Sequence, residues 1–420
     1  MFKPPVSSDH TGEQEPSPPA MSHGALFLRF LRFGALAFGG PVAQIAMVRH
    51  ELVDGEGWIS SARFNRLLAV MQVLPGPEAH ELCVHLGMRA KGRWGGLLAG
   101  LGFMLPGFVL MMLLSWLYFR IDFDRSWVGA AFLGVQAAVV ALIVRAVHRI
   151  GQHVLVDRWL WAIGIVAGVA ALLNVSFWIT LPACGVAYVL AKAGRRGLAL
   201  GVAALAAGIA IIVMLVTPER AAAALSIMVA DTPGSVAPLV LFLSGLKAGL
   251  LTFGGAYTAI PFLRNDAVGR GWMGDGQFLD GLALSGILPA PLIIFSTFIG
   301  YVAGGPPGAV AITAGIFLPA FAFSLIFYDR LETLVEAPGV KVLLEGVAAG
   351  VVGLIAATTL ELGKGLLSPL ERAPFPLTIA AGALIALFLW KSKLAPPLVL
   401  LASGVAGAAF LGSGNGPPGF

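Results

Sequence analysis

Apolar segments long enough to cross a lipid bilayer recur along almost the whole of this sequence. A transmembrane helix needs about 20 apolar residues, and from Ala25 onward about thirteen stretches meet that need. Hydrophobic residues make up 58% and charged residues 12% of the chain, whereas roughly 25% of residues are charged in soluble domains. The sequence therefore predicts an all-α integral membrane protein. The candidate spans are residues 25–48, 68–88, 96–119, 128–148, 158–174, 176–192, 198–216, 238–262, 278–301, 306–328, 341–361, 375–390 and 395–412.

Proline and glycine interrupt several of these spans, most clearly between residues 74 and 87. This stretch, LPGPEAHELCVHLG, has Pro75, Gly76 and Pro77 in the middle of an apolar run. Proline removes backbone donors and glycine removes helical stiffness, so a helix is expected to break here. Inside a membrane, irregular backbone is tolerated only where it is buried in protein or lines a cavity. The element returns as Leu288-Pro289-Ala290-Pro291, which the uncharged sequence LIIFSTFIGY follows.

These two breaks belong to a duplication that extends over most of the chain. Phe38-Gly39-Gly40 recurs as Phe253-Gly254-Gly255, and later matches follow in the same order with an almost constant offset. Such a fixed order over about a hundred positions predicts two homologous repeats. The further pairs are Arg49 with Arg264, Trp58 with Trp272, Phe64 with Phe278, Leu74-Pro75 with Leu288-Pro289, Pro77 with Pro291, Gly87 with Gly300, Leu105-Pro106 with Leu318-Pro319, and Gly134-Val135 with Gly346-Val347.

The duplication predicts both the division of the chain and its topology. Six spans per repeat and one linking span place the second repeat upside down in the membrane, as in many secondary transporters. This arrangement puts the loop containing Asp54 outside and the loop containing Arg270 inside, and it leaves more Lys and Arg in the cytoplasmic loops. The predicted fold is a pair of inverted helical repeats with broken helices and about 10–13 transmembrane segments. Its parts are a disordered cytoplasmic tail at 1–23, repeats at 24–192 and 238–412, a linking span and loop at 193–237, and a short tail at 413–420.

The duplicated glycine pairs are candidates for an anion-binding site. Phe38-Gly39-Gly40-Pro41 follows Arg29 and Arg32, and Phe253-Gly254-Gly255 follows Lys247. Paired glycines let a backbone unwind, and the exposed N–H groups can hold an anion together with the positive end of a half-helix. The alternatives are that the glycines serve close helix packing and that the basic side chains extend to the membrane interface. The duplication favours the anion site.

Four ionisable residues follow the first break and form a candidate proton-coupling site. Glu78, His80, Glu81 and His85 lie within two helical turns of Pro77. An unpaired carboxylate in an apolar bundle is costly and tends to take up a proton, which a proton-coupled transporter requires. A Glu–His pair that only fixes packing is the alternative. Two imidazoles without further ligands at a fixed spacing do not predict a metal site.

The remaining polar residues and motifs exclude several functions. Asp280, Glu345 and Glu361 are expected to be interfacial or helix-terminus charges, and Cys83 and Cys184 are expected to serve packing. No Walker A, HExxH or GxSxG sequence occurs, so neither an enzyme nor a cofactor is predicted. The net charge of +5 comes from Lys and Arg dispersed in short loops, which argues against nucleic-acid binding.

The duplicated order of FGG, Arg, Trp, Phe, LP and Pro motifs resembles the CHR chromate ion transporter family, in its two-domain, long-chain form. The resemblance covers nearly the whole chain and implies a proton-linked chromate exporter of the bacterial inner membrane that confers chromate resistance. Two features depart from the family pattern, because Ala290 stands where glycine is common and residues 78–81 are unusually charged. The binding residues that carry over are Phe38, Gly39, Gly40, Pro41, Pro75, Gly76, Pro77, Phe253, Gly254, Gly255, Pro289 and Pro291.

The sequence thus predicts a secondary transporter, an antiporter, that exports the chromate dianion. Moving a dianion out of a negative cytoplasm gains about 4.6 kcal/mol per 100 mV, so proton exchange adds to this drive. One alternative is a transporter for sulfate or another anion, moved inward with protons. An alternative of another class is a membrane scaffold or accessory subunit that transports nothing. The expected partners are chromate, its mimic sulfate, protons, the lipid bilayer and a second copy of the chain in a homodimer.

Overall fold

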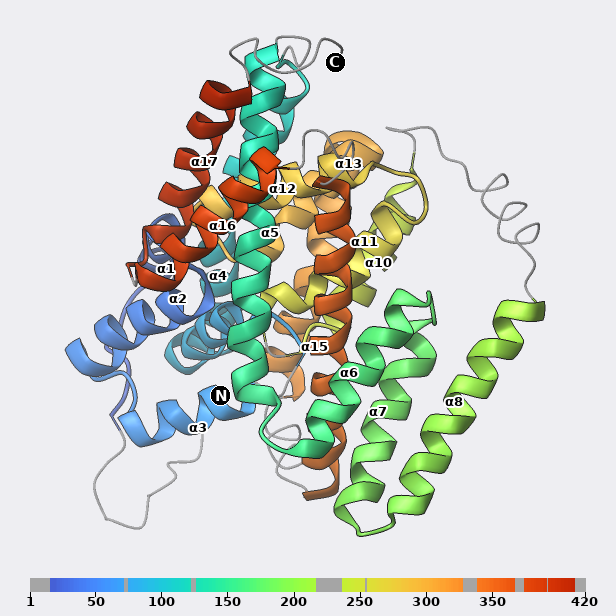
Figure 1. Cartoon of the computed structure of the whole chain (residues 1–420). Helices are drawn as coiled ribbons and strands as arrows, with labels where there is room; N and C mark the ends of the chain where they lie inside the picture. The colour runs from blue at the N-terminus through green and yellow to red at the C-terminus, as the bar shows by residue number, and fades with distance from the viewer. Residues whose placement is uncertain are drawn as a thin grey trace.

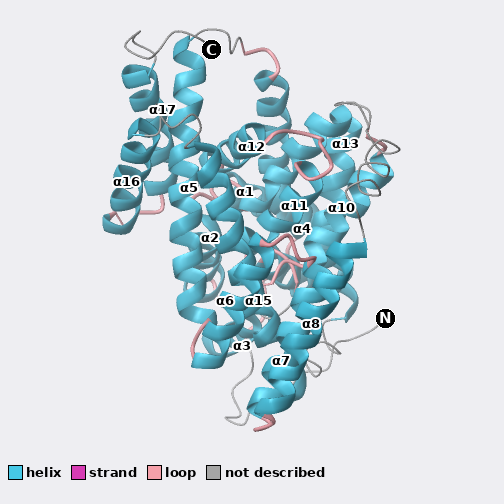
Figure 2. Cartoon of the chain, turned by 45° about the vertical axis from the view of Figure 1, so that its right-hand side comes forward, coloured by secondary structure: helices cyan, strands magenta, loops and turns pink. Residues whose placement is uncertain are grey.

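The computed structural model describes residues 16–71, 75–121, 126–216, 236–253, 255–327, 338–366, 374–390 and 392–411. Within these ranges the chain is helical, and its only extended pairing is an isolated antiparallel bridge between Pro75 and Phe253 (Figure 2). Four of the described helical segments are long and apolar enough to cross a membrane. The all-α membrane fold predicted from the sequence is confirmed.

The helices follow the same order in both repeats. The first repeat contains α1 (His23–Ala35), α2 (Gly40–Arg49), η1 (His50–Gly55), α3 (Ser61–Met71), α4 (Glu78–Tyr118), α5 (Ser126–Val154), α6 (Arg158–Leu172) and α7 (Phe177–Lys192). The helix α8 (Arg196–Val216) then occupies the predicted linking span. The second repeat contains α10 (Pro238–Leu250), η2 (Ala256–Ala259), α11 (Ile260–Ala267), α12 (Asp275–Ile287), η3 (Leu292–Ile294), α13 (Phe295–Ala322), η4 (Phe323–Phe327), α15 (Pro338–Leu366), α16 (Pro374–Leu389) and α17 (Ala395–Leu411).

A sharp kink divides α4 and α13 at equivalent positions. Lys91 and Gly92 have φ/ψ of −143°/26° and 62°/−160°, and Gly304 and Gly305 have −145°/21° and 62°/−159°. The positive φ at the second residue of each pair favours glycine. Each helix therefore forms a hairpin of a short arm and a long arm, with the short arm first. Gly87 permits this close approach, since a Cβ there would lie 2.5 Å from the carbonyl oxygen of Gly95.

Four predicted spans turn out to be pairs of short helices rather than single helices. Residues 25–48 divide into α1 and α2, residues 68–88 into α3 and the short arm of α4, and the second repeat divides 238–262 and 278–301 in the same way. The reason is that proline and glycine break the helix in the middle of each apolar run, which length and hydropathy alone do not reveal.

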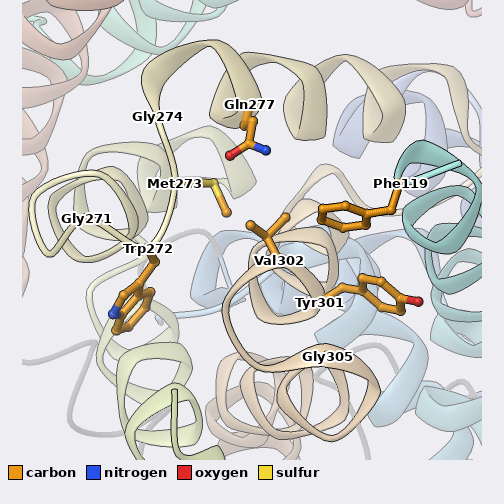
Figure 3. Close-up of a pocket in the computed structure, with 9 residues that line it drawn as sticks. All are labelled: Phe119, Gly271, Trp272, Met273, Gly274, Gln277, Tyr301, Val302 and Gly305. Carbon is orange, nitrogen blue, oxygen red and sulfur yellow. The ribbon is translucent and has the colours of Figure 1, made fainter. Parts of the chain in front are cut away.

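Each of these helix pairs returns to the end of the molecule from which it started. In the first repeat, Arg89, near the hairpin tip, donates to the carbonyl of Pro16 before α1 at 3.1 Å, and Glu56, which follows α2 and η1, pairs with Arg29 in the first half of α1. In the second repeat, the N–H of Val236, just before α10, donates to the carbonyl of Ala303 at 3.0 Å, beside the hairpin tip. The loop 271–274, between α11 and α12, lines one open pocket together with Gly305 at that tip (Figure 3). The start of α10, the loop between α11 and α12 and the hairpin tip therefore lie together.

The long arms of the two hairpins run in opposite directions. Phe119, which follows the end of α4, lines the same pocket as Gly305, where the long arm of α13 begins. At the other end, a Cβ on Gly96 would meet Leu325, and one on Gly100 would meet Phe321. The end of each long arm thus lies against the beginning of the other.

The later helices of each repeat pack against those of the other repeat. The long helix α5 packs on α16 and α17 of the second repeat, and α15 packs on α6 and α7 of the first (Figure 1). Glycines allow both contacts, because a Cβ on Gly134 would lie 2.9 Å from Cα of Gly407 and one on Gly346 would lie 3.0 Å from Cα of Gly185. Most of the buried apolar side chains of the second repeat and of α5 form one core, and α1 to α4 of the first repeat form another.

Candidate functional site

The break in the first repeat lies against the glycine pair of the second. The N–H of Gly76 donates to the carbonyl of Thr252 at 2.9 Å, and Pro75 forms a bridge with Phe253. Two irregular segments thereby satisfy each other's backbone groups, as segments buried among apolar helices must. The predicted residue Gly254 and the neighbouring Leu74 lie outside the described residues.

A matching contact joins the glycine pair of the first repeat to the break in the second. The side-chain nitrogen of Gln44, on α2, donates to the carbonyl of Ala37 at 2.9 Å and to that of Ala290 at 3.0 Å. Gln44 is 1% exposed, and its side-chain oxygen has no hydrogen-bond partner among the described residues. The sequence analysis missed this residue, although an isolated glutamine within an apolar helix was a usable signal.

Helices begin at each of these four irregular segments. After Gly39, with φ of +93°, α2 begins at Gly40, and α4 begins at Glu78 directly after Pro77. In the second repeat, η2 follows Gly255, which has φ of +114°. The first N–H groups of a helix have no partner within the helix, and its N-terminus carries a partial positive charge. Gly39, Gly40 and Gly255 thus have a positive φ. In the first repeat, α2 begins at the glycine pair and α4 at the break.

The break segments lie halfway along the long arms rather than at the ends of the molecule. A Cβ on Gly107, near the middle of the long arm of α4, would lie 2.4 Å from Cβ of Ala290 at the second break. In the first repeat, Gly34 near the end of α1 approaches Phe103 on the long arm of α4. Backbone dipoles at this depth are remote from bulk water. Their electrostatic effect is larger there than at the surface, because less water screens it.

Both predicted glutamates flank the junction between the repeats. Glu78 is 8% exposed, and a Cβ on Gly255 would lie 3.9 Å from its carboxylate oxygen. Glu81 is fully buried, and neither carboxylate oxygen has a hydrogen-bond partner in the described chain. Its carboxyl group points at Gly76, because a Cβ on that glycine would overlap one oxygen and lie 3.2 Å from Cδ.

The two predicted histidines have different surroundings. The ring of His80 is packed between Phe317 and Phe321, with ring centroids 4.9 and 4.7 Å away, and it lies near the backbone of Gly100. Neither glutamate is hydrogen bonded to His80, so nothing supports the alternative of a Glu78–His80 or Glu81–His80 pair. His85 lies near the middle of the short arm, within electrostatic range of Arg89 and Arg63.

The three basic residues predicted near the glycine pairs are held in ion pairs. Arg29 pairs with Glu56 and stacks on Trp58, with its guanidinium 5.4 Å from the ring centroid. Arg32 lies 3.6 Å from Glu51 and is largely exposed. Lys247, in the equivalent position of the second repeat, lies 2.5 Å from Asp266, which is 2% exposed. Their contribution to anion binding stays a prediction.

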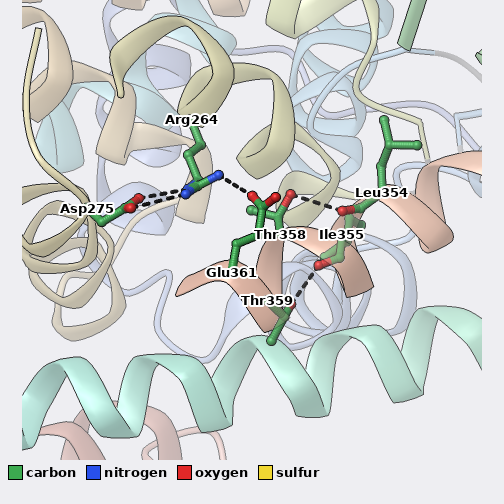
Figure 4. A network of polar contacts seen from close by, with 7 residues as sticks. All are labelled: Arg264, Asp275, Leu354, Ile355, Thr358, Thr359 and Glu361. Atoms are coloured by element: carbon green, nitrogen blue, oxygen red, sulfur yellow. Dashed lines mark hydrogen bonds and ion pairs between the residues drawn. The ribbon is translucent and has the colours of Figure 1, made fainter. Parts of the chain in front are cut away.

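Asp280 and Glu361 were predicted to be interfacial or helix-terminus charges, and for Asp280 this is wrong. Asp280 is 4% exposed and accepts hydrogen bonds from Tyr118 at 2.7 Å and Gln136 at 2.8 Å, both in the first repeat. The error arose because a single carboxylate in an apolar segment does not reveal whether neutral donors surround it. Glu361 is half-buried and pairs with Arg264, which also binds Asp275 at 2.8 and 3.1 Å (Figure 4).

Comparison with known proteins gives a consistent result. A model of the family described as Chromate transporter matches residues 24–190 and 239–408. The Chromate transport protein of Pseudomonas aeruginosa is 63% identical over 97% of this chain and 96% of its own length, and that of Cupriavidus metallidurans is 32% identical over 92% of both chains. Uncharacterized transporter YwrB of Bacillus subtilis is 30% identical over 34% of this chain and 72% of its own length. No solved structure matches the chain.

Proposed function

Because this chain belongs to the chromate transporter family, we propose that it is a secondary transporter that exports chromate from the cell in exchange for protons. Members of this family are transporters rather than enzymes. The apolar helices make the chain a multi-pass membrane protein, which we assign to the bacterial inner membrane. Export there lowers the cytoplasmic chromate concentration and confers resistance.

The two repeats are, in our proposal, inverted across the membrane, with the tip of the α4 hairpin in the cytoplasm. The opposed long arms support inversion, and the positive-inside rule supports this orientation. Because α1 and α2 return to one end, the loop with Asp54 is assigned to the cytoplasm and that with Arg270 to the outside, the reverse of the sequence expectation. Basic residues assigned to the cytoplasmic end include Arg49, Arg63, Arg66, Arg89, Lys91, Arg93, Arg149, Arg158, Lys192, Arg195 and Arg196, and those assigned to the outer end include Arg120, Arg264, Arg270 and Lys364.

Labelling of single cysteines tests this orientation directly. An impermeant thiol reagent added to intact cells is expected to modify Arg270→Cys and to leave Asp54→Cys unmodified until the membrane is opened. Cys83 and Cys184 are both buried and provide a low background. Modification of both introduced cysteines from outside would contradict the proposal that each helix pair returns to its own side and that the two repeats are inverted.

The anion site that we propose lies at the junction between the repeats, where the first break meets the glycine pair of the second repeat. The observation that carries this proposal is the contact of Gly76 with Thr252, beside the unpartnered carboxyl group of Glu81. A compact oxyanion suits this position because the N-termini of α2 and α4 offer backbone N–H groups and partial positive charge. The discontinuous helices of other inverted-repeat transporters bind anionic groups in the same way.

Glu78 and Glu81 couple protons to the anion in this proposal. A dianion and an ionised carboxylate repel each other strongly where little water is present, so the protonation state at the junction changes when the anion binds. The same repulsion favours joint binding of a proton and an anion, and this observation supports one second candidate: inward co-transport of sulfate or another anion with protons. The membrane potential favours export, by about 4.6 kcal/mol per 100 mV for a dianion.

Flux measurements in inverted membrane vesicles distinguish these functions. Labelled chromate is expected to accumulate when the lumen is acidic, because chromate then enters as protons leave. Accumulation driven by an acidic exterior, or of sulfate alone, would favour the co-transport candidate. Absence of any anion flux from well-inserted protein would favour the alternative that the chain is a membrane scaffold or accessory subunit that transports nothing.

A variant of Glu78 separates coupling from binding in the same vesicles. Glu78→Gln imitates the protonated side chain, so chromate exchange at equal pH should persist and accumulation under a pH gradient should be lost. Glu51→Gln is the matched control, because Glu51 pairs with the exposed Arg32 away from the breaks, and it should retain both activities. Full gradient-driven accumulation by Glu78→Gln would remove this residue from the mechanism.

A further inference from the structure

Asp280 occupies a polar cluster that belongs to neither break. Its carboxylate joins α12 of the second repeat to Tyr118 at the end of α4 and to Gln136 on α5. Both partners are neutral donors, so the buried carboxylate accepts two hydrogen bonds without a cation beside it. Burial favours the neutral form of such a carboxyl group, whereas the two donated hydrogen bonds favour its ionised form.

The cluster lies beneath an open pocket at the end assigned to the outside. This pocket has a volume of about 490 Å³ and is lined by aromatic and polar side chains from both repeats. Figure 3 shows Gln277 pointing into the space between Met273 and Phe119. Gln277 and Tyr118 also line a neighbouring pocket of about 350 Å³. Tyr118 therefore connects pocket space directly to the carboxyl group of Asp280.

Within the described residues, Asp280 forms no ion pair. Tyr118 is the titratable residue of α4 at this end, and Arg120, which follows it, lies over the ring of Trp116. Tyr301 is the titratable residue of α13, and α17 and η3 carry none. The basic side chains of α5 lie at its far end, beyond Gln136. On α12 and α15, Asp275 and Glu361 are both bound to Arg264, and Lys364 lies three residues beyond Glu361. In the described part of the chain, the hydrogen bonds to Asp280 thus come from neutral side chains.

The equivalent positions in the first repeat are basic. Phe64 matches Phe278, so Arg66 stands where the second repeat has Asp280, and Arg63 stands where it has the neutral Gln277. At these positions the arginines of the first repeat favour an oxyanion, whereas the carboxyl group of Asp280 favours a proton. The end at which the pocket opens, here called the outer mouth, therefore differs in charge from the cytoplasmic end at these equivalent positions.

We propose that Asp280 is a proton-binding site at the outer mouth, and that its protonation releases α12 from Tyr118 and Gln136. The ionised carboxylate accepts both hydrogen bonds and ties the repeats together. A protonated carboxyl group must itself donate one hydrogen bond, so it cannot keep both donors equally well. A proton that arrives through the pocket thereby loosens the outer mouth. This site extends the proposed function and is separate from Glu78 and Glu81.

A cysteine placed deeper on α12 reports this opening without any transport measurement. Ser285 lies between Asp280 and the break, is 2% exposed and is closely matched in size by cysteine. Its labelling by a thiol reagent is compared with that of Gly274→Cys, which lines the pocket and where a Cβ meets no atom within 4 Å. The ratio of the two rates cancels the effect of pH on thiol reactivity.

The ratio is expected to rise at least fivefold between pH 8 and pH 5.5. In Asp280→Asn, which imitates the protonated form, the ratio should be high and independent of pH. A second variant, Tyr118→Phe, removes one donor to the ionised form and should move the midpoint of the curve to higher pH by about one unit, a tenfold change in proton affinity. A ratio that is equally low in Ser285→Cys and in its Asp280→Asn version at every pH would overturn the proposal.

This readout remains valid if chromate is not the substrate. Loss of chromate flux with an intact pH-dependent labelling ratio would contradict the proposed function and leave the Asp280 site standing. A normal chromate flux with a ratio that does not depend on pH or on Asp280 would contradict the site alone.

Discussion

The breaks in the two repeats share a backbone plan and differ in almost every side chain that could do chemistry. Gly76 of the first repeat corresponds to Ala290 of the second, and Glu78 corresponds to Leu292. The hairpin kinks that follow agree within a few degrees in φ and ψ. Duplication has therefore preserved the scaffold on both sides and kept ionisable groups on one side only. Thr252 and Phe253 of the second repeat hold the first break through backbone contacts, while the ionisable residues lie in the first break.

The backbone plan also accounts for a one-residue difference between the short arms. From Pro77 to Gly87 the first repeat uses one residue more than the second uses from Pro291 to Gly300. The second repeat begins its arm with the 3₁₀ turn η3. A 3₁₀ helix rises about 2.0 Å per residue and an α-helix about 1.5 Å, so fewer residues cover the same length.

The largest difference between the repeats is expected at the break itself. Gly76 has φ of +142°, and any Cβ there would overlap the carboxyl group of Glu81 and lie 3.3 Å from Ala320. Gly76→Leu should abolish chromate flux while the protein still inserts, because its side chain fills the junction. Ala290→Gly, at the equivalent position of the second repeat, removes a methyl group and should leave flux near that of the wild type. Vesicle flux normalised to inserted protein measures both, and equal behaviour of the two variants would contradict a site at the first break.

The sequence was informative about the breaks because proline and glycine act locally. Pro75 to Pro77 and the glycine pairs could be recognised without any knowledge of packing, and the matched pairs fixed which segments are equivalent. The sequence could not show that α1 and α2 return to one side, since apolar length is the same for one span and for two half-helices. It also could not show that Gln44 would bridge Ala37 and Ala290, because that contact joins residues far apart in the chain.

A second, smaller contrast concerns the equivalent ion pairs Arg32–Glu51 and Lys247–Asp266. The first is largely exposed, so Arg32→Met should lower the free energy of unfolding by at most about 1 kcal/mol. Lys247→Met leaves Asp266 buried with Ser244 and Arg270 as partners, so a loss of about 2–4 kcal/mol is expected. Thermal unfolding in detergent measures both variants.

The double variant Lys247→Met/Asp266→Leu sharpens this comparison. Removing both charges should restore much of the stability, because no buried carboxylate is then left without its cation. If this double variant is stable and still transports chromate, Lys247 serves only the ion pair. A stable protein that has lost chromate flux would instead support the predicted contribution of Lys247 to anion binding.

The smallest expected contrast lies at the hairpin tips, where the repeats should behave alike. Gly92 and Gly305 both have φ of +62°, a conformation that costs other residues roughly 1–3 kcal/mol. A Cβ on Gly92 would meet no atom within 4 Å, and one on Gly305 would meet only the ring of Pro307 at 3.9 Å. Backbone strain is therefore the shared cost of Gly92→Ala and Gly305→Ala, and the two should lower the unfolding temperature by similar amounts. Gly274→Ala is the control, because its φ of −85° suits alanine and it should leave stability unchanged. A large loss at one tip and none at the other would mean that the two hairpins are not equivalent, and the comparison between the repeats would then hold only for their sequences.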